Sequence, residues 1–139
     1  INLENKIKNK FVDITNLKEL KKIFINFKPD YVFHLAAQSL VKKSYKEPLL
    51  TYNSNTIGTL NIMECLKELK NNCIAVIITS DKSYKNLEIK RGYKEDDVLG
   101  GFDPYSSSKA SAELIIQTYY KSYLAKKKIL ELELLELET

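Results

Sequence analysis

The feature that most constrains the fold is an alternation of short apolar runs with helical patterns. Residues 31–35 (YVFHL) form a continuous apolar run, as in strands buried on both faces of a sheet. Residues 74–79 (IAVIIT) form the clearest strand of the chain, and between the two runs residues 49–69 carry apolar side chains at helical spacing. Strands joined through helices pair in parallel. The sequence therefore predicts an α/β fold, a parallel sheet with helices on its faces.

Other elements fit the same plan. Asn16 can cap a helix that Pro29 stops, and Asp103 can cap a third helix that runs from Pro104 to about Tyr123. Residues 11–13 (FVD) are a short apolar piece ending in an acid, a predicted strand end. There are no internal repeats and no linker, so we expect residues 1–125 to form one domain.

Composition excludes several classes of protein. The net charge is +4, but the lysines are spread among acids over all 139 residues, which does not favour a nucleic-acid partner. No run reaches the length of a membrane span, so we expect a cytoplasmic protein with no membrane partner. Cys65 and Cys73 lack metal or redox spacing, and the single histidine, His34, sits inside a predicted strand. We expect reduced thiols, a buried core histidine and no metal site.

Tyr105 and Lys109 lie four residues apart just after the start of the third helix, so both should share one helix face. The lysine charge and the positive helix end both favour a phenolate, which can take a proton from a hydroxyl group of a bound molecule. A YxxxK pattern alone is common by chance, and a surface pair without a role is the competing interpretation.

The clearest strand ends in Thr79-Ser80-Asp81-Lys82. This places a hydroxyl, an acid and an amine at the carboxyl edge of a parallel sheet, where ligands bind in open α/β folds. The alternative is a polar turn in which Asp81 only caps backbone amides.

Four segments together resemble the extended short-chain dehydrogenases/reductases that process nucleotide sugars. They are residues 34–38 (HLAAQ), 55–59 (NTIGT), 79–82 (TSDK) and 105–109 (YSSSK), in the order and spacing of that family. Residues 100–105 (GGFDPY) and the Ser-Asp-Lys triplet most resemble the CDP-glucose 4,6-dehydratase branch. The resemblance spans roughly residues 10–123 and implies NAD as cofactor and a nucleotide sugar, CDP-glucose in particular, as substrate.

The resemblance also implies catalytic roles. Tyr105 would remove the C4 hydroxyl proton while hydride passes to NAD, and Lys109 would bind the nicotinamide ribose. Ser80 would hydrogen-bond the same hydroxyl, Asp81 would protonate the departing C6 hydroxyl, and Lys82 would assist at C5. Many related dehydratases carry Glu at the position of Lys82, and this lysine is what points to the CDP-sugar branch.

Cofactor contacts follow by the same resemblance. Asp13 matches an acid that contacts adenine, and Asn55 matches a helix residue that supports the site. The implied cofactor-binding residues are Asp13, Leu35, Ala36, Ala37, Gln38, Asn55, Thr79, Tyr105 and Lys109.

Parts of such an enzyme are absent from the sequence. None of the four glycines forms the GxGxxG turn that receives a dinucleotide pyrophosphate. We therefore expect a partial doubly wound, Rossmann-like parallel sheet that lacks its first βαβ unit and the C-terminal substrate domain. Residues 126–139 are an aberrant tail, either an amphipathic tail or edge strand, or a frameshift. One choice of codons that encodes this tail, when read in the frame one base earlier, encodes GIRTARAGN. This peptide resembles the family's next strand.

The expected function is therefore that of a fragment of an NAD-dependent nucleotide-sugar 4,6-dehydratase, a lyase, inactive alone. An epimerase or another sugar dehydratase is the first alternative, although Asp81-Lys82 favours loss of water. A non-enzymatic association module is the second. The resemblance implies a homodimer of the parent enzyme through the helices at residues 49–69 and 104–123.

Overall fold

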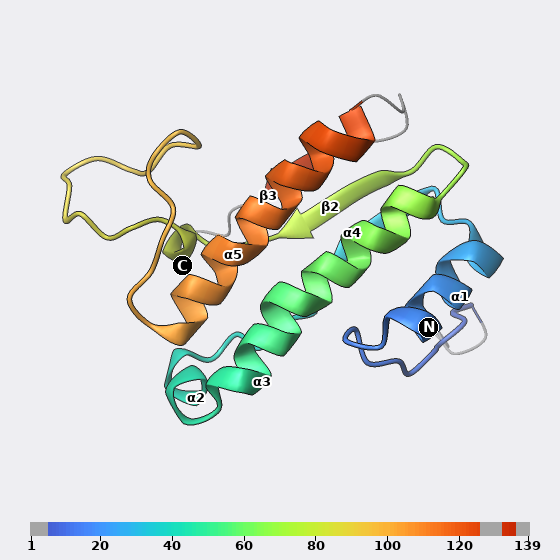
Figure 1. Ribbon diagram of the computed structural model, residues 1–139, viewed down its shortest axis with the longest axis horizontal. Helices are drawn as coiled ribbons and strands as arrows, with labels where there is room; N and C mark the ends of the chain where they lie inside the picture. The colour runs from blue at the N-terminus through green and yellow to red at the C-terminus, as the bar shows by residue number, and fades with distance from the viewer. Residues whose placement is uncertain (1–5, 126–131, 136–139) are drawn as a thin grey trace.

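A computed structural model describes residues 6–125 and 132–135 and contains a three-stranded parallel sheet in the order β1-β2-β3 (Figure 1). Tyr31 lies opposite Ile74, and Ala75 lies opposite Leu132. The strands are β1 (Tyr31–His34), β2 (Ile74–Ile78) and β3 (Leu132–Leu135). The sheet confirms the predicted α/β class with parallel strands, and β3 lies within the segment that the sequence analysis describes as a tail. Residues 126–131 and 136–139 lie outside the described residues.

The predicted helices are confirmed, with two π-helical segments that the spacing did not indicate. The segment η2 (Asn53–Ile57) joins α3 to α4, and η4 (Tyr120–Leu124) continues α5. The short helix α2 was missed because its sequence, VKKSYK, lacks an apolar stripe. The α-helices are α1 (Leu17–Phe27), α2 (Val41–Lys46), α3 (Pro48–Tyr52), α4 (Gly58–Glu68) and α5 (Pro104–Tyr119).

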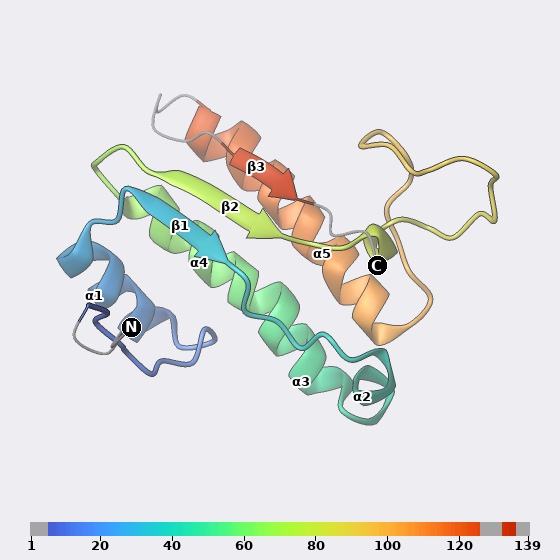
Figure 2. The same cartoon turned by 180° about the vertical axis from the view of Figure 1, so that it is seen from behind.

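The core lies between the sheet and one layer of helices. Helices α4 and α5 run across one face of the sheet, and α1 packs beside α4 (Figures 1 and 2). Met63 and Leu66 of α4, Ile116 of α5, and Ala75 and Ile77 of β2 are almost fully buried in this layer. The central strand is thereby fixed against the two helices that carry the predicted site.

The prediction that β1 is buried on both faces was wrong. Tyr31 is 62% exposed and Phe33 is 64% exposed, whereas His34 is buried. In the described part of the chain, the helices cover only one face of the sheet (Figure 2). The outward side chains of β1 therefore remain in contact with solvent.

The predicted strand end at residues 11–13 was also wrong. These residues form no strand, and Phe11 is 93% exposed. Among the described residues no strand lies beside them to complete a ladder. The segment is held instead by Ile14, whose carbonyl oxygen accepts a hydrogen bond from the Asn61 side chain at 2.9 Å.

No helix within residues 6–125 combines the length and apolar character that crossing a membrane requires.

Candidate active site

The start of α5 is fixed by its cap and by a close approach of the preceding loop. The Asp103 carboxylate accepts hydrogen bonds from the Ser106 backbone N–H at 3.0 Å and from its hydroxyl at 2.6 Å. Gly101 lies so near that a Cβ there would stand 2.1 Å from the Ser106 Cβ. The cap confirms the predicted helix start and places Tyr105 and Lys109 on the first turns of α5.

Both of these side chains are buried: Tyr105 is 9% exposed and Lys109 is 7% exposed. The Lys109 Nζ donates a hydrogen bond to the Ile78 carbonyl oxygen at 3.2 Å. Burial lowers the pKa of Lys109, and the Glu113 carboxylate opposes that shift. The amine is therefore held at the carboxyl end of β2.

The turn that follows β2 carries the other predicted catalytic residues. The Ser80 hydroxyl accepts from the Lys82 backbone N–H at 3.2 Å and donates to the Asp81 carboxylate at 3.1 Å. Asp81 and Lys82 form an ion pair at 3.4 Å. Because the 3-10 turn η3 (Asp81–Ser83) packs against α5, the two predicted segments lie side by side.

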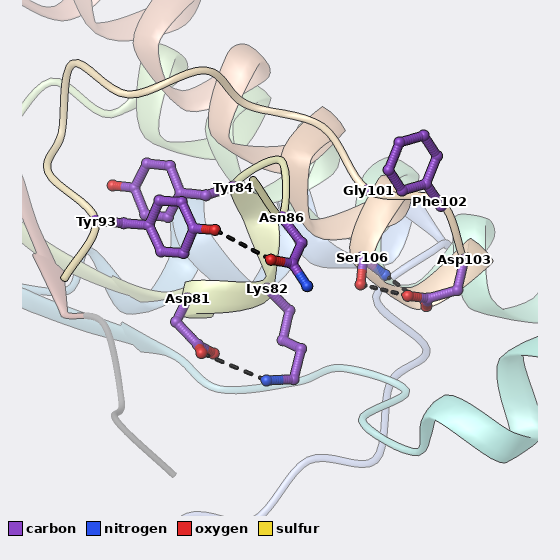
Figure 3. A pocket seen from close by; sticks show the side chains of 9 residues that line it. All are labelled: Asp81, Lys82, Tyr84, Asn86, Tyr93, Gly101, Phe102, Asp103 and Ser106. Carbon is purple, nitrogen blue, oxygen red and sulfur yellow. Dashed lines mark hydrogen bonds and ion pairs between the residues drawn. The ribbon is translucent and has the colours of Figure 1, made fainter. Parts of the chain in front are cut away.

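A cavity of about 330 Å³ opens beside this turn (Figure 3). Its lining includes Asp81 and Lys82, whereas Ser80, Tyr105 and Lys109 are not part of it. The lining residues are Asp81, Lys82, Tyr84, Asn86, Tyr93, Gly101, Phe102, Asp103 and Ser106. The sequence motifs did not indicate Tyr84, Asn86 and Tyr93, which belong to the polar segment between β2 and α5. Two tyrosines and an asparagine in one polar loop were the available signal.

The segment that follows β1 is exposed and has small side chains. Leu35 is 68% exposed, and Ala36 and Ala37 are also exposed. At the end of β2 the Thr79 hydroxyl is buried with no hydrogen-bond partner among the described residues. An accessible strand end after β1, an unsatisfied hydroxyl after β2 and the Lys109 amine are therefore found at the carboxyl ends of these two strands.

Asn55 joins this segment to both long helices. Its Oδ1 accepts from the Gln38 backbone N–H at 2.8 Å, and its Nδ2 donates to the Gln38 carbonyl oxygen at 3.0 Å. The same Nδ2 donates to the Ser108 hydroxyl at 2.9 Å. The Gln38 side chain in turn donates to Thr51 at 2.9 Å. Asn55 is 1% exposed, so these bonds are shielded from water.

Asp13 is not joined to these residues. Its carboxylate accepts hydrogen bonds from the backbone N–H and the hydroxyl of Thr15, both at 2.8 Å. The same two bonds lower the pKa of Asp13, which is exposed. The carboxylate serves the turn before α1.

His34 is a buried, hydrogen-bonded core histidine, as predicted. It is 6% exposed, and its Nε2 lies 3.0 Å from the Thr59 hydroxyl. Burial and the Lys109 charge lower its pKa to about 4. Both cysteines are free thiols, and burial raises the pKa of Cys65 to about 11. Within the described residues, no group of three or more His, Cys, Asp or Glu could hold a metal ion.

Comparison with known proteins places these features in a family. The family model described as GDP-mannose 4,6-dehydratase matches residues 1–130. The chain is 41% identical over 123 residues to the CDP-glucose 4,6-dehydratase of Salmonella typhimurium, covering 88% of this chain and 34% of that enzyme. It thus spans about a third of that relative's length.

Two solved structures are similar in fold and sequence. One is the UDP-glucose 4-epimerase of Thermus thermophilus in complex with NAD, with a TM-score of 0.72 and 27% identity. The alignment covers 91% of this chain and 39% of that one. The other is the UDP-glucose 4-epimerase of Thermotoga maritima with UDP-glucose, with a TM-score of 0.77 and 25% identity. It covers 90% of this chain and 39% of that one.

Proposed function

We propose that this chain carries the catalytic segment of a CDP-glucose 4,6-dehydratase. The premise is that the chain belongs to the GDP-mannose 4,6-dehydratase family of extended short-chain dehydrogenases/reductases. The observation that supports this proposal most strongly is the Asp81–Lys82 pair on the wall of a cavity beside the start of α5. Loss of water needs a proton donor for the departing hydroxyl, and an epimerase has no such need.

The proposed reaction converts CDP-glucose to CDP-4-keto-6-deoxyglucose and water. NAD, when bound, would supply the acceptor for the C4 hydride and the source of the hydride for C6. Tyr105 takes the C4 hydroxyl proton, and Ser80 hydrogen-bonds the same oxygen. Lys109 holds the nicotinamide ribose, and Asp81 protonates the departing C6 hydroxyl. Lys82 assists loss of the C5 proton, and a proton returns to C5 when hydride is added to C6.

The nicotinamide end of NAD would lie against the exposed strand end at residues 35–37 and the buried hydroxyl of Thr79. The sequence contains no GxGxxG turn for the pyrophosphate. We therefore infer that these 139 residues alone bind NAD weakly and do not turn over substrate.

A chimeric enzyme tests the proposal directly. Residues 10–123 replace the matching segment of the Salmonella typhimurium enzyme, whose remaining parts supply what this chain does not contain. We expect the chimera to convert CDP-glucose with loss of one water, measured by mass spectrometry. Tyr105→Phe should lower kcat by about 10²–10⁴-fold because the proton acceptor is lost. Tyr45→Phe, at an exposed position on α2, is the matched control.

Two outcomes contradict the proposal. A folded chimera that binds NAD but leaves CDP-glucose unchanged would show that the segment serves another substrate. A product of unchanged mass with inverted C4 would instead identify the segment as that of an epimerase.

A non-enzymatic association module is the second candidate, favoured by apolar residues exposed on the long helices. Leu49 is 74% exposed, Leu114 is 55% exposed and Tyr123 is 48% exposed. These surfaces would join two copies in a helical bundle through residues 49–69 and 104–123, the homodimer expected of the parent enzyme. The mass of the chain in solution tests this, and a strictly monomeric chain would contradict it.

A further inference from the structure

The loop between β2 and α5 is closed at its base by backbone hydrogen bonds. The Lys85 N–H donates to the Val98 carbonyl oxygen at 2.8 Å, and the Gly100 N–H donates to the Ser83 carbonyl oxygen at 2.8 Å. These bonds fix both ends of the loop at residues 86–97, which is called the excursion below.

The excursion is also tied within itself. The Arg91 guanidinium donates to both carboxylate oxygens of Asp97 at 2.7 Å, and the Lys94 backbone N–H donates to the same carboxylate at 2.9 Å. The Arg91 hydrogen bonds, with that of Lys94, lower the pKa of Asp97 to about 2. The carboxylate therefore stays ionised, and bidentate pairing of this kind fixes the geometry of the turn.

Tyr93 anchors the excursion over the cavity. Its ring stacks on that of Tyr84, with centroids 5.3 Å apart and planes 5° apart. Tyr84 is 6% exposed, so it offers a fixed platform. The Tyr93 hydroxyl accepts from the Leu87 backbone N–H at 3.1 Å and donates to the Asn86 Oδ1 at 3.4 Å.

These contacts determine which way the Asn86 amide points. Its Oδ1 also accepts from the Glu88 backbone N–H at 3.0 Å. A backbone N–H only donates, so the atom that it contacts must be the oxygen. The Asn86 Nδ2 then faces the cavity, on the side of Lys82 (Figure 3). Among the described residues this nitrogen has no hydrogen-bond partner.

We propose that Asn86 positions the substrate by donating a hydrogen bond from Nδ2 to a hydroxyl of the hexose, and that Tyr93 holds Asn86 in place. The proposal rests on the proposed function, because Asp81 and Lys82 line the same cavity and are assigned to C6 and C5 of that sugar. The carboxylates of Asp81 and Asp103 also line it, which disfavours an anionic group. A neutral hydroxyl accepts a hydrogen bond without that repulsion.

The test is a titration of the ¹⁵N-labelled chimeric enzyme, in which residues 10–123 of this chain are joined to the remaining parts of the Salmonella typhimurium enzyme, by CDP-glucose and separately by CDP. The Asn86 side-chain amide signals are identified by their loss in Asn86→Ala. We expect them to shift saturably with CDP-glucose and not with CDP, because the contact is to the hexose. Asn86→Ala should raise the Kd for CDP-glucose by about tenfold, the usual effect of one hydrogen bond.

Tyr93→Phe separates positioning from direct contact. It keeps the ring stack on Tyr84 but removes the hydroxyl, so we expect the ligand-free Asn86 amide signals to shift and the Kd to rise several-fold. Lys90→Ala is the matched control, since Lys90 is exposed in the same excursion and lines no part of the cavity. It should leave both the signals and the Kd unchanged.

The outcomes are distinguishable. If CDP-glucose shifts the backbone amides of residues 81–84 but not the Asn86 side chain, the inference is wrong and the proposed function stands. If CDP alone produces the Asn86 shift, the contact is to the nucleotide and the inference is again wrong. If CDP-glucose shifts no signal, the proposed substrate is wrong and the inference falls with it.

Discussion

The Lys109 side-chain amine is hydrogen-bonded to the Ile78 carbonyl oxygen at 3.2 Å, which ties α5 to the last residue of β2. The same charge lies close enough to His34 to lower the pKa of its imidazole. Lys109 thus affects the pKa of a residue on β1, although its hydrogen bond is to β2.

Lys109→Met should raise the pKa of His34 above its value of about 4, because one positive charge near the imidazole is removed. The pKa should stay below 6.5, since burial, the larger cause of the shift, remains. A proton NMR titration measures this cleanly because the chain contains one histidine. Lys90→Met, which neutralises an exposed lysine, serves as the control. An unchanged pKa in Lys109→Met would contradict the assigned coupling.

Stability should depend on pH through His34. Its pKa is about 4 when folded and about 6.5 when unfolded, so the unfolded chain binds more protons between these values. The unfolding free energy is therefore unaffected by this titration above pH 6.5. It falls by about 3 kcal/mol in all as the pH is lowered towards 4. Urea unfolding of the wild type and His34→Gln across this range measures it. The difference between the two chains should shrink as the pH falls, and a constant difference would contradict the prediction.

Asn55→Ala should destabilise the fold by about 3 kcal/mol, because it leaves the Gln38 backbone groups and the Ser108 hydroxyl without their buried partner. Asn53→Ala is the matched control, since Asn53 lies in the same π-helical segment but is exposed. It should change the unfolding free energy by less than about 0.5 kcal/mol. Equal losses in the two variants, measured by urea unfolding, would show that the effect comes from the helix backbone.

Gly101→Ala should lower stability by about 1–3 kcal/mol, because its Cβ would stand 2.1 Å from the Ser106 Cβ and 2.8 Å from the Ser106 backbone carbon. Gly92→Ala, in the same loop, meets nothing within 4 Å and should be neutral or slightly stabilising. Thermal unfolding compares the two. If Gly101→Ala is as stable as Gly92→Ala, the loop does not press against α5 in solution.

The long elements could be predicted from the sequence because their signals are local. The Asn16 and Asp103 caps and the helical spacing of residues 17–27 gave α1 and the start of α5. The candidate catalytic residues followed from two short motifs at strand and helix ends. Which of those residues share a cavity could not be predicted, since that depends on long-range packing of η3 against α5.

The misses have a common physical origin. Phe11 and Phe33 are apolar, and their sequence context predicts buried strand residues. Burial depends on which other segments cover a side chain, and among the described residues both side chains remain largely exposed. The role of Asn86 depends on the Oδ1 contacts that orient its amide, and no spacing in the sequence encodes these contacts.

The π-helical segment at Asn53–Ile57 limits how the chain can vary in length. A π turn holds more residues than an α turn. The wider turn absorbs its extra residue, so α3 and α4 keep about the relative rotation of one continuous α-helix. Deletion of one residue there, with return to an α turn, would leave Met63 and Leu66 facing the sheet. A deletion within α4 itself would instead rotate the residues beyond it by about 100° and turn part of the core-facing side away from the sheet. The chain can therefore lose a residue between Tyr52 and Gly58 more easily than within α4.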